Sequence, residues 1–164
     1  MIKTIIISFV LCLVETVTII LISPIAKPKL VISFLPEDIR EAAKNHPEPA
    51  KWKQVVAHLI TGVFCVIMLS GIIYLGIDGI KNGYGYWQFV GRFITLLYIM
   101  KLYDIVVQDQ WLVLSTNYFK KIFPETINCA GWKNRHFNDR NHFKRIILYP
   151  LLALVISGIL ILFK

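Results

Sequence analysis

Lys101 and Asp104 lie in a stretch of the chain, residues 86–107, that is otherwise apolar and long enough to cross a bilayer; Gln108 follows it. The three residues are spaced i, i+3 and i+7, so on a helix they share a sector roughly 60° wide. A charged side chain in hydrocarbon costs about 3 kcal/mol or more and usually faces a bundle interior or a wet cavity. The spacing therefore predicts a polar site inside the membrane.

The first apolar stretch, residues 4–23, carries a polar stripe that could match this face. Its members recur every three or four residues: Thr4, Ser8, Cys12, Glu15 and Thr18. At about 1.5 Å per residue, Glu15 and Lys101 lie about 17 and 22 Å from the same membrane face. Two unpaired charges at similar depths cost less together than apart, so we expect Glu15 and Lys101 to be coupled.

The same count brings two further residues to this depth. His58 and Asp104 lie about 25 and 27 Å from that face. The predicted intramembrane polar site therefore consists of Glu15, His58, Lys101, Asp104 and Gln108. It has two interpretations: a structural ion pair that joins helices, or a pocket that binds a small ion or polar ligand or relays protons.

A second group of polar residues lies near the end of the chain. His136, Asp139 and His142 are spaced i, i+3 and i+6, a weak metal-binding pattern that His46 or Glu125 could complete. Basic neighbours oppose a cation there, and they favour a loop that binds anionic lipid head groups: Lys133, Arg135, Arg140, Lys144 and Arg145. We therefore expect no metal and no cofactor.

Four apolar stretches must position these residues: 4–23, 55–77, 86–107 and 146–163. Hydrophobic residues make up 56% of the 164-residue chain and gather in these runs, which is typical of a membrane protein. Backbone groups in lipid must be satisfied within each segment, and the runs lack the alternation of barrel strands. The sequence predicts an all-α polytopic membrane protein, residues 1–164 forming a single four-helix membrane domain.

The net charge of +8 is concentrated in the two long connections, residues 24–54 and 108–145. Thirteen of the eighteen Lys and Arg residues lie there, among them Lys27, Lys29, Lys51, Lys53, Lys120 and Lys121. With four spans these connections share one side, so the positive-inside tendency predicts cytoplasmic loops, both termini outside, and the cell membrane as location. Anionic lipid head groups, not nucleic acid, are then the expected partners of the basic residues.

Both connections contain helical patterns of their own. Residues 36–44 begin with Pro36 and two acids, which predicts a short cytoplasmic helix. Residues 108–123 carry apolar residues near helical spacing and end at Pro124, which predicts either a prolongation of the third span or a helix at the interface. We expect its aromatic residues to be packed, because exposing them all to water is costly.

Three functions remain open on the sequence alone. The first is a protein with a cytoplasm-facing polar site for an ion or a polar or lipid ligand. The second is a membrane-embedded enzyme acting on a lipid or isoprenoid through Asp104, His58 or the loop from His136 to His142. The third is an accessory subunit that pairs with a partner membrane subunit or with a second copy. P-loop, GxGxxG and GxSxG motifs are absent, and they would have favoured an enzyme.

Overall fold

The computed structural model describes residues 1–163, and it is helical without strands in that range. Four long helices form a bundle: α1 (Ile2–Ile22), α4 (Lys51–Lys81), α5 (Tyr86–Tyr103) and α7 (Asp139–Ile161). A π-helix, η1 (Asp104–Ser115), continues α5. The short helices are α2 (Pro28–Ile32), α3 (Glu37–Ala42), α6 (Tyr118–Ile122) and the 3₁₀ turns η2 (Pro124–Thr126) and η3 (Ala130–Lys133). The all-α prediction is confirmed.

Three of the long helices, α1, α4 and α7, are long and apolar enough to cross a membrane. α5 has 18 residues but carries Arg92 and Lys101, and both side chains are buried. α5 packs against α1 on one side and α7 on the other. Its two charged residues therefore face protein, which explains why α5 is less apolar than its three neighbours.

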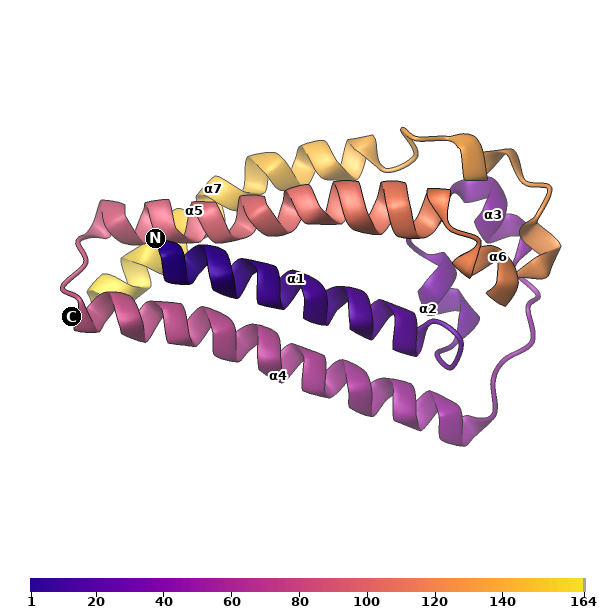
Figure 1. The fold of residues 1–164 in the computed structure, drawn as a ribbon, viewed down its shortest axis with the longest axis horizontal. Coiled ribbons are helices and arrows are strands. Elements are labelled where there is room, and N and C mark those ends of the chain that lie inside the picture. The colour runs from indigo at the N-terminus through magenta and orange to yellow at the C-terminus, as the bar shows by residue number, and fades with distance from the viewer. Residues whose placement is uncertain (164) are drawn as a thin grey trace.

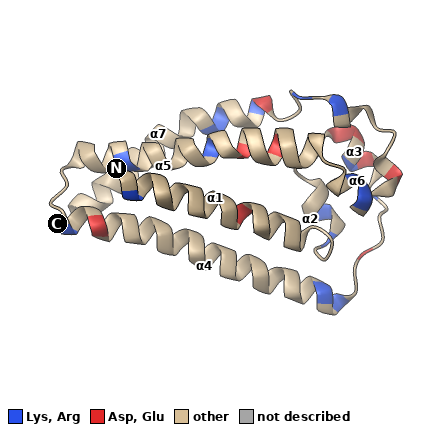
Figure 2. Ribbon diagram, in the orientation of Figure 1, with Lys and Arg blue, Asp and Glu red and all other residues tan. Residues whose placement is uncertain are grey.

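The bundle is elongated, with α1 between α4 and α5, and with α7 packed on α5 (Figure 1). We name its two ends by what lies there. The turn end holds the short connection between α4 and α5, and α7 ends near it (Figure 1). The cap end holds α2, α3 and α6 (Figure 1). Lys and Arg residues gather toward the cap end (Figure 2), as the charge distribution in the sequence predicts.

Large apolar side chains cover the outside of α1, α4 and α7. Those that are at least half exposed include Leu13, Val17, Leu59, Val63, Leu69, Ile147, Leu151 and Val155. α5 exposes far less, with Trp87 and Leu102 as its exposed large apolar residues. Such an apolar exterior is unfavourable in water and suits a lipid environment.

Each end of the bundle has its own hydrophobic core. At the turn end the core joins α1, α4, α5 and α7 through Leu11, Leu75, Phe89, Phe93, Leu96 and Ala153. Gly79 makes the close approach of α4 and α5 feasible there, because a Cβ at Gly79 would lie 2.3 Å from the Phe89 ring. The tight hairpin therefore depends on the absence of a side chain at this position.

At the cap end, the two long connections fold together around a second core. It contains Val31, Leu35, Ile39, Leu112, Val113, Phe119, Phe123 and Trp132. The Gly131 amide donates to Asp38 Oδ2 at 2.7 Å and the Trp132 indole donates to the Thr126 carbonyl at 2.7 Å. Residues 108–123 thus prolong α5 as far as Ser115 and then pack within this cap, although Trp111 stays 54% exposed.

Candidate functional site

The π-helix η1 builds one wall of the site. Hydrogen bonds between residues five apart mark its winding: the Thr116 amide donates to the Trp111 carbonyl at 3.0 Å. A π-helix turns on the order of 80° per residue, against about 100° for an α-helix. Positions i, i+4 and i+5 therefore fall on one face, which carries Asp104, Gln108, Asp109, Leu112 and Val113.

A polar cavity of about 580 Å³ lies in front of this wall. Its other sides come from Ile19 of α1, the segment 33–40 that includes α3, and the loop and first turns leading into α7. The polar side chains of the lining include Arg40, Asn134, Asn138, Asn141 and Arg145. Cavities of this size commonly accept small ligands.

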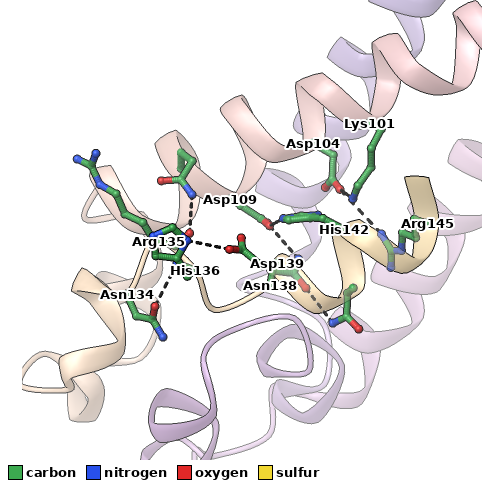
Figure 3. A network of polar contacts seen from close by, with 12 residues as sticks. Lys101, Asp104, Asp109, Asn134, Arg135, His136, Asn138, Asp139, His142 and Arg145 are labelled. Carbon is green, nitrogen blue, oxygen red and sulfur yellow. Dashed lines mark hydrogen bonds and ion pairs between the residues drawn. The ribbon is translucent and has the colours of Figure 1, made fainter. Parts of the chain in front are cut away.

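Asp104 lies between two cations at the edge of the cavity (Figure 3). The Lys101 ammonium lies 2.5 Å from Asp104 Oδ2, and the Arg145 guanidinium lies 3.9 Å from the same oxygen. The Lys101 side chain is 2% exposed, whereas that of Asp104 is 22% exposed. Asp104 therefore connects a buried charge on α5 to an exposed one on α7.

The predicted coupling of Glu15 to Lys101 takes a different form. Among the described residues, Lys101 forms its ion pair with Asp104, one turn along its own chain, and none with Glu15. Glu15 is half-buried on α1 and does not line the polar cavity. The sequence could have predicted the pair of Lys101 with Asp104, because residues i and i+3 are neighbours on a helix surface.

Asp109 is a site residue that the spacing of an α-helix does not predict. Its Oδ2 lies 2.9 Å from His142 Nε2 and accepts from the Asn138 side-chain amide at 2.8 Å, linking η1 to the start of α7 (Figure 3). Burial raises the pKa of the Asp109 carboxyl. On an α-helix Asp109 would lie about 140° from Asp104, so only the π winding places both on one wall. In the sequence, the three consecutive polar residues 108–110 were the signal that could have revealed Asp109 as a site residue.

Gln108 is buried and only half satisfied. Its Nε2 donates to Thr16 Oγ1 at 3.0 Å, and Thr16 is also 2.9 Å from the Tyr103 hydroxyl. The other side-chain atom, Oε1, is buried without a hydrogen-bond partner, as is Nδ1 of His142. Buried polar atoms are rarely left unpaired, and Gln108 is one of the residues that line the cavity, so its unpaired acceptor favours a ligand that supplies a donor.

His58 does not join this site. It is exposed near the start of α4, with Nδ1 2.6 Å from the Gln54 carbonyl. It lines a separate apolar pocket of about 260 Å³ beside the end of α1. The sequence-based expectation rested on depth, and depth does not determine which side of a helix a residue occupies.

The loop proposed to bind head groups is exposed, and one of its members belongs to the cavity. Lys133, Arg135, Arg140 and Lys144 are exposed outside it, while Arg145 lines it. Of the metal candidates, His136 lies 2.8 Å from Asp139 at the surface, and His46 pairs with Glu125 at 2.8 Å. Within residues 1–163, no three His, Cys, Asp or Glu side chains are grouped so as to hold a metal ion.

A second charged cluster lies at the turn end. Arg92, 1% exposed, donates to the Leu75 carbonyl at 2.7 Å, to Asp78 Oδ2 at 2.9 Å and to the Tyr84 hydroxyl at 3.0 Å. Lys3 donates to Asp78 Oδ1 at 2.6 Å. Sequence reasoning missed this cluster, although a short turn between α4 and α5 implies that Asp78 and Arg92 face each other across the hairpin.

No protein-family model, curated protein sequence or solved structure matches this chain.

Proposed function

We propose that this chain is a four-span membrane protein whose cap faces the cytoplasm and whose polar cavity binds a small hydroxylated ligand carrying a phosphate. The observation that carries the proposal is that Gln108, whose buried Oε1 has no hydrogen-bond partner, is one of the residues that line a polar cavity of about 580 Å³. The donors and acceptors of the lining residues suggest the chemistry of the ligand.

Acceptors on the cavity wall favour hydroxyl groups. Gln108 Oε1 lacks a donor, and the Asn141 amide donates to Asn138, which leaves the Asn141 oxygen available. Asp38 is less available, because its carboxylate accepts from the backbone amides of Ile39 and Gly131. Amide oxygens accept hydrogen bonds readily from ligand hydroxyls.

Two arginines on the wall offer partners for a phosphate, although four carboxylates share the lining: Glu37, Asp38, Asp104 and Asp109. Arg145 has Asp104 as its one ionic partner within residues 1–163, at 3.9 Å, and its side chain is 55% exposed. Arg40 lines the same cavity, and its guanidinium forms no hydrogen bond or ion pair with another described residue. Guanidinium groups match phosphate oxygens in both charge and geometry.

Support for a fourth span comes from the position of α5. α5 runs beside α1 and α7, and a short turn joins it to α4 (Figure 1). A helix that accompanies three apolar helices along their length crosses the same layer, with its polar residues turned inward. Four spans place both termini on the side opposite the basic cap, outside the cell membrane.

Thiol labelling tests the topology. We would replace Cys129 with Ser and introduce single cysteines by Lys81→Cys at the turn end and Lys133→Cys in the cap. A membrane-impermeant maleimide should label the first from outside intact cells and the second only after permeabilisation. Labelling of the Lys133 position in intact cells would contradict the proposed orientation.

Binding is tested with glycerophosphoglycerol, a diester with hydroxyls at both ends and no hydrocarbon chain. The variant Gln108→Leu should weaken binding at least tenfold, because it removes the unpaired acceptor. The matched control is Gln110→Leu, the same change two residues along η1, where the Gln110 amide donates to the Arg135 carbonyl outside the cavity lining. Equal binding by both variants, or none by the parent protein, would overturn the proposed function.

A further inference from the structure

An apolar pocket adjoins the polar cavity. The pocket, of about 260 Å³, lies between the end of α1, α2 and the start of α4. Ile19 and Phe34 line both spaces, so these two side chains form the common wall. A polar and an apolar compartment with shared walls match the two halves of an amphiphile.

The apolar pocket offers no unsatisfied hydroxyl to a polar group. Its two hydroxyl side chains donate to carbonyls of their own helices: Ser23 to Ile19 at 2.6 Å and Thr61 to Ala57 at 2.8 Å. His58 Nδ1 is likewise engaged with the Gln54 carbonyl. The rest of the lining is hydrocarbon, including Ile22, Ala26, Leu30 and Val31. Such a wall favours methylene groups over any polar ligand atom.

Phe34 occupies the boundary between the two compartments. It belongs to the segment between α2 and α3, is 39% exposed, and packs edge-on against Phe119 with ring centroids 5.9 Å apart. An aromatic side chain at an exposed boundary has one face against the cap core and another available to a ligand. A hydrocarbon chain leaving the polar cavity would meet this ring first.

We infer that the ligand of the polar cavity is a lipid amphiphile, whose phosphate and hydroxyl head group lies in the cavity and whose hydrocarbon chain passes Phe34 into the apolar pocket. This inference rests on the proposed function. Free phosphorylated polyols share the head-group chemistry, and the presence of a chain distinguishes the lipid from them. Each methylene buried in the pocket should tighten binding about fourfold.

The experiment compares two probes that differ only in the chain: glycerophosphoglycerol and lauroyl lysophosphatidylglycerol. Binding of each to the full chain is measured by native mass spectrometry from a non-ionic detergent. The lysolipid should bind at least a hundredfold more tightly than its head group alone. Lauroyl lysophosphatidylcholine has the same chain but a quaternary ammonium in place of the terminal hydroxyls, and it should bind at least tenfold more weakly.

Thr61→Phe fills the apolar pocket and should bring the affinity of the lysolipid down to within threefold of its head group. Val63→Phe is the matched control, since Val63 lies two residues away on α4, is 60% exposed and lines a different groove. Unchanged head-group binding shows that the Thr61 variant is folded. If that variant loses head-group binding as well, Leu30→Trp at the pocket's exposed rim replaces it.

The two hypotheses fail in different ways. If the head group alone binds in a manner that depends on Gln108, but the chain adds nothing that Thr61→Phe removes, the amphiphile inference is wrong and the proposed function stands. If the head group does not bind at all, the proposed function is wrong. Equal binding of the two lysolipids would overturn the assignment of a hydroxylated head group.

Discussion

The turn end and the cap end each hold a buried cation beside a carboxylate, yet they differ in how their polar atoms are used. At the turn end, Arg92 contacts a carbonyl, a carboxylate and a hydroxyl, and the Tyr84 ring lies 4.4 Å from its guanidinium carbon. At the cap end, Lys101 pairs with Asp104 beside a cavity, and buried atoms of Gln108 and His142 have no partner. Arg92 Nε and Thr4 Oγ1 at the turn end are also buried without a partner, but among the described residues only Gln108 combines such an atom with a place in the lining of the polar cavity.

The difference indicates what each cluster does. The Arg92 cluster lines neither the polar cavity nor the apolar pocket, and its contacts join the two arms of the α4–α5 hairpin. The cap-end cluster borders the polar cavity, and the unpaired amide oxygen of Gln108 is a polar group that stability alone does not require. Substitutions in the Arg92 cluster should therefore change stability without changing binding, whereas substitution of Gln108 should change binding with little effect on stability.

The largest effect is expected for Arg92→Met. This change leaves the Asp78 carboxylate without its buried partner and removes three hydrogen bonds, so the free energy of unfolding should fall by about 3 kcal/mol. Thermal and denaturant unfolding in detergent measure it. Lys3→Met is the control, since the Lys3 side chain is 58% exposed, and its effect should be far smaller. Equal losses would contradict a buried, structural role for Arg92.

A double-mutant cycle at the cap end should give the next largest value. We expect Lys101→Met and Asp104→Asn to be coupled by about 1–3 kcal/mol, because the Lys101 ammonium and the Asp104 carboxylate form a close ion pair. The cycle of Lys101→Met with Glu15→Gln should give a smaller coupling. A larger coupling energy for Lys101 with Glu15 than for Lys101 with Asp104 would show that Glu15 is the main partner of Lys101.

Gly131→Ala tests whether the cap is a packed unit. A Cβ at this position would lie 2.1 Å from Asp38 Oδ1 and 2.7 Å from the Pro36 ring, so we expect a loss of about 1–3 kcal/mol. Gly91→Ala is the control, because its Cβ would meet no atom within 4 Å and the change favours the helix. Limited proteolysis of residues 108–138 should be faster only in the Gly131 variant.

The smallest effect on stability is expected for Gln108→Leu. The change loses the hydrogen bond to Thr16 but also removes a buried unpaired oxygen, so unfolding should stay within about 1 kcal/mol of the parent protein. A loss as large as that of Arg92→Met would show that the Gln108 amide is a structural group, and the contrast between the two ends would disappear.

The sequence predicted the helical class and most of the bundle, because apolar runs near twenty residues leave few alternatives in lipid. It also placed Lys101, Asp104 and Gln108 on one face, and Asp104 and Gln108 do line the cavity. Asp109 was missed because an α-helical period was assumed where the chain adopts a π-helix. Apolar periodicity carries no signal for the extra residue in each turn.

Other differences arise from contacts between distant segments. His58 was expected in the site, but which side of α4 faces the bundle depends on how α4 packs against α1. The cap cavity also requires residues 33–40 and 134–145 to meet, a pairing held by Asp38 with Gly131 and by Asn138 with Asp109. Such contacts join residues 93 and 29 positions apart, and no local pattern encodes them.

One measurement tests the division between a structural end and a binding end most directly. The unfolding temperature is recorded with and without glycerophosphoglycerol for the parent protein, Asp78→Asn at the turn end and Gln108→Leu at the cap end. A ligand raises the unfolding temperature only where it binds the folded state. We predict that Asp78→Asn unfolds at a lower temperature but keeps the full ligand-induced rise, whereas Gln108→Leu unfolds close to the parent protein and loses that rise. A ligand-induced rise that persists in Gln108→Leu, or disappears in Asp78→Asn, would contradict the account.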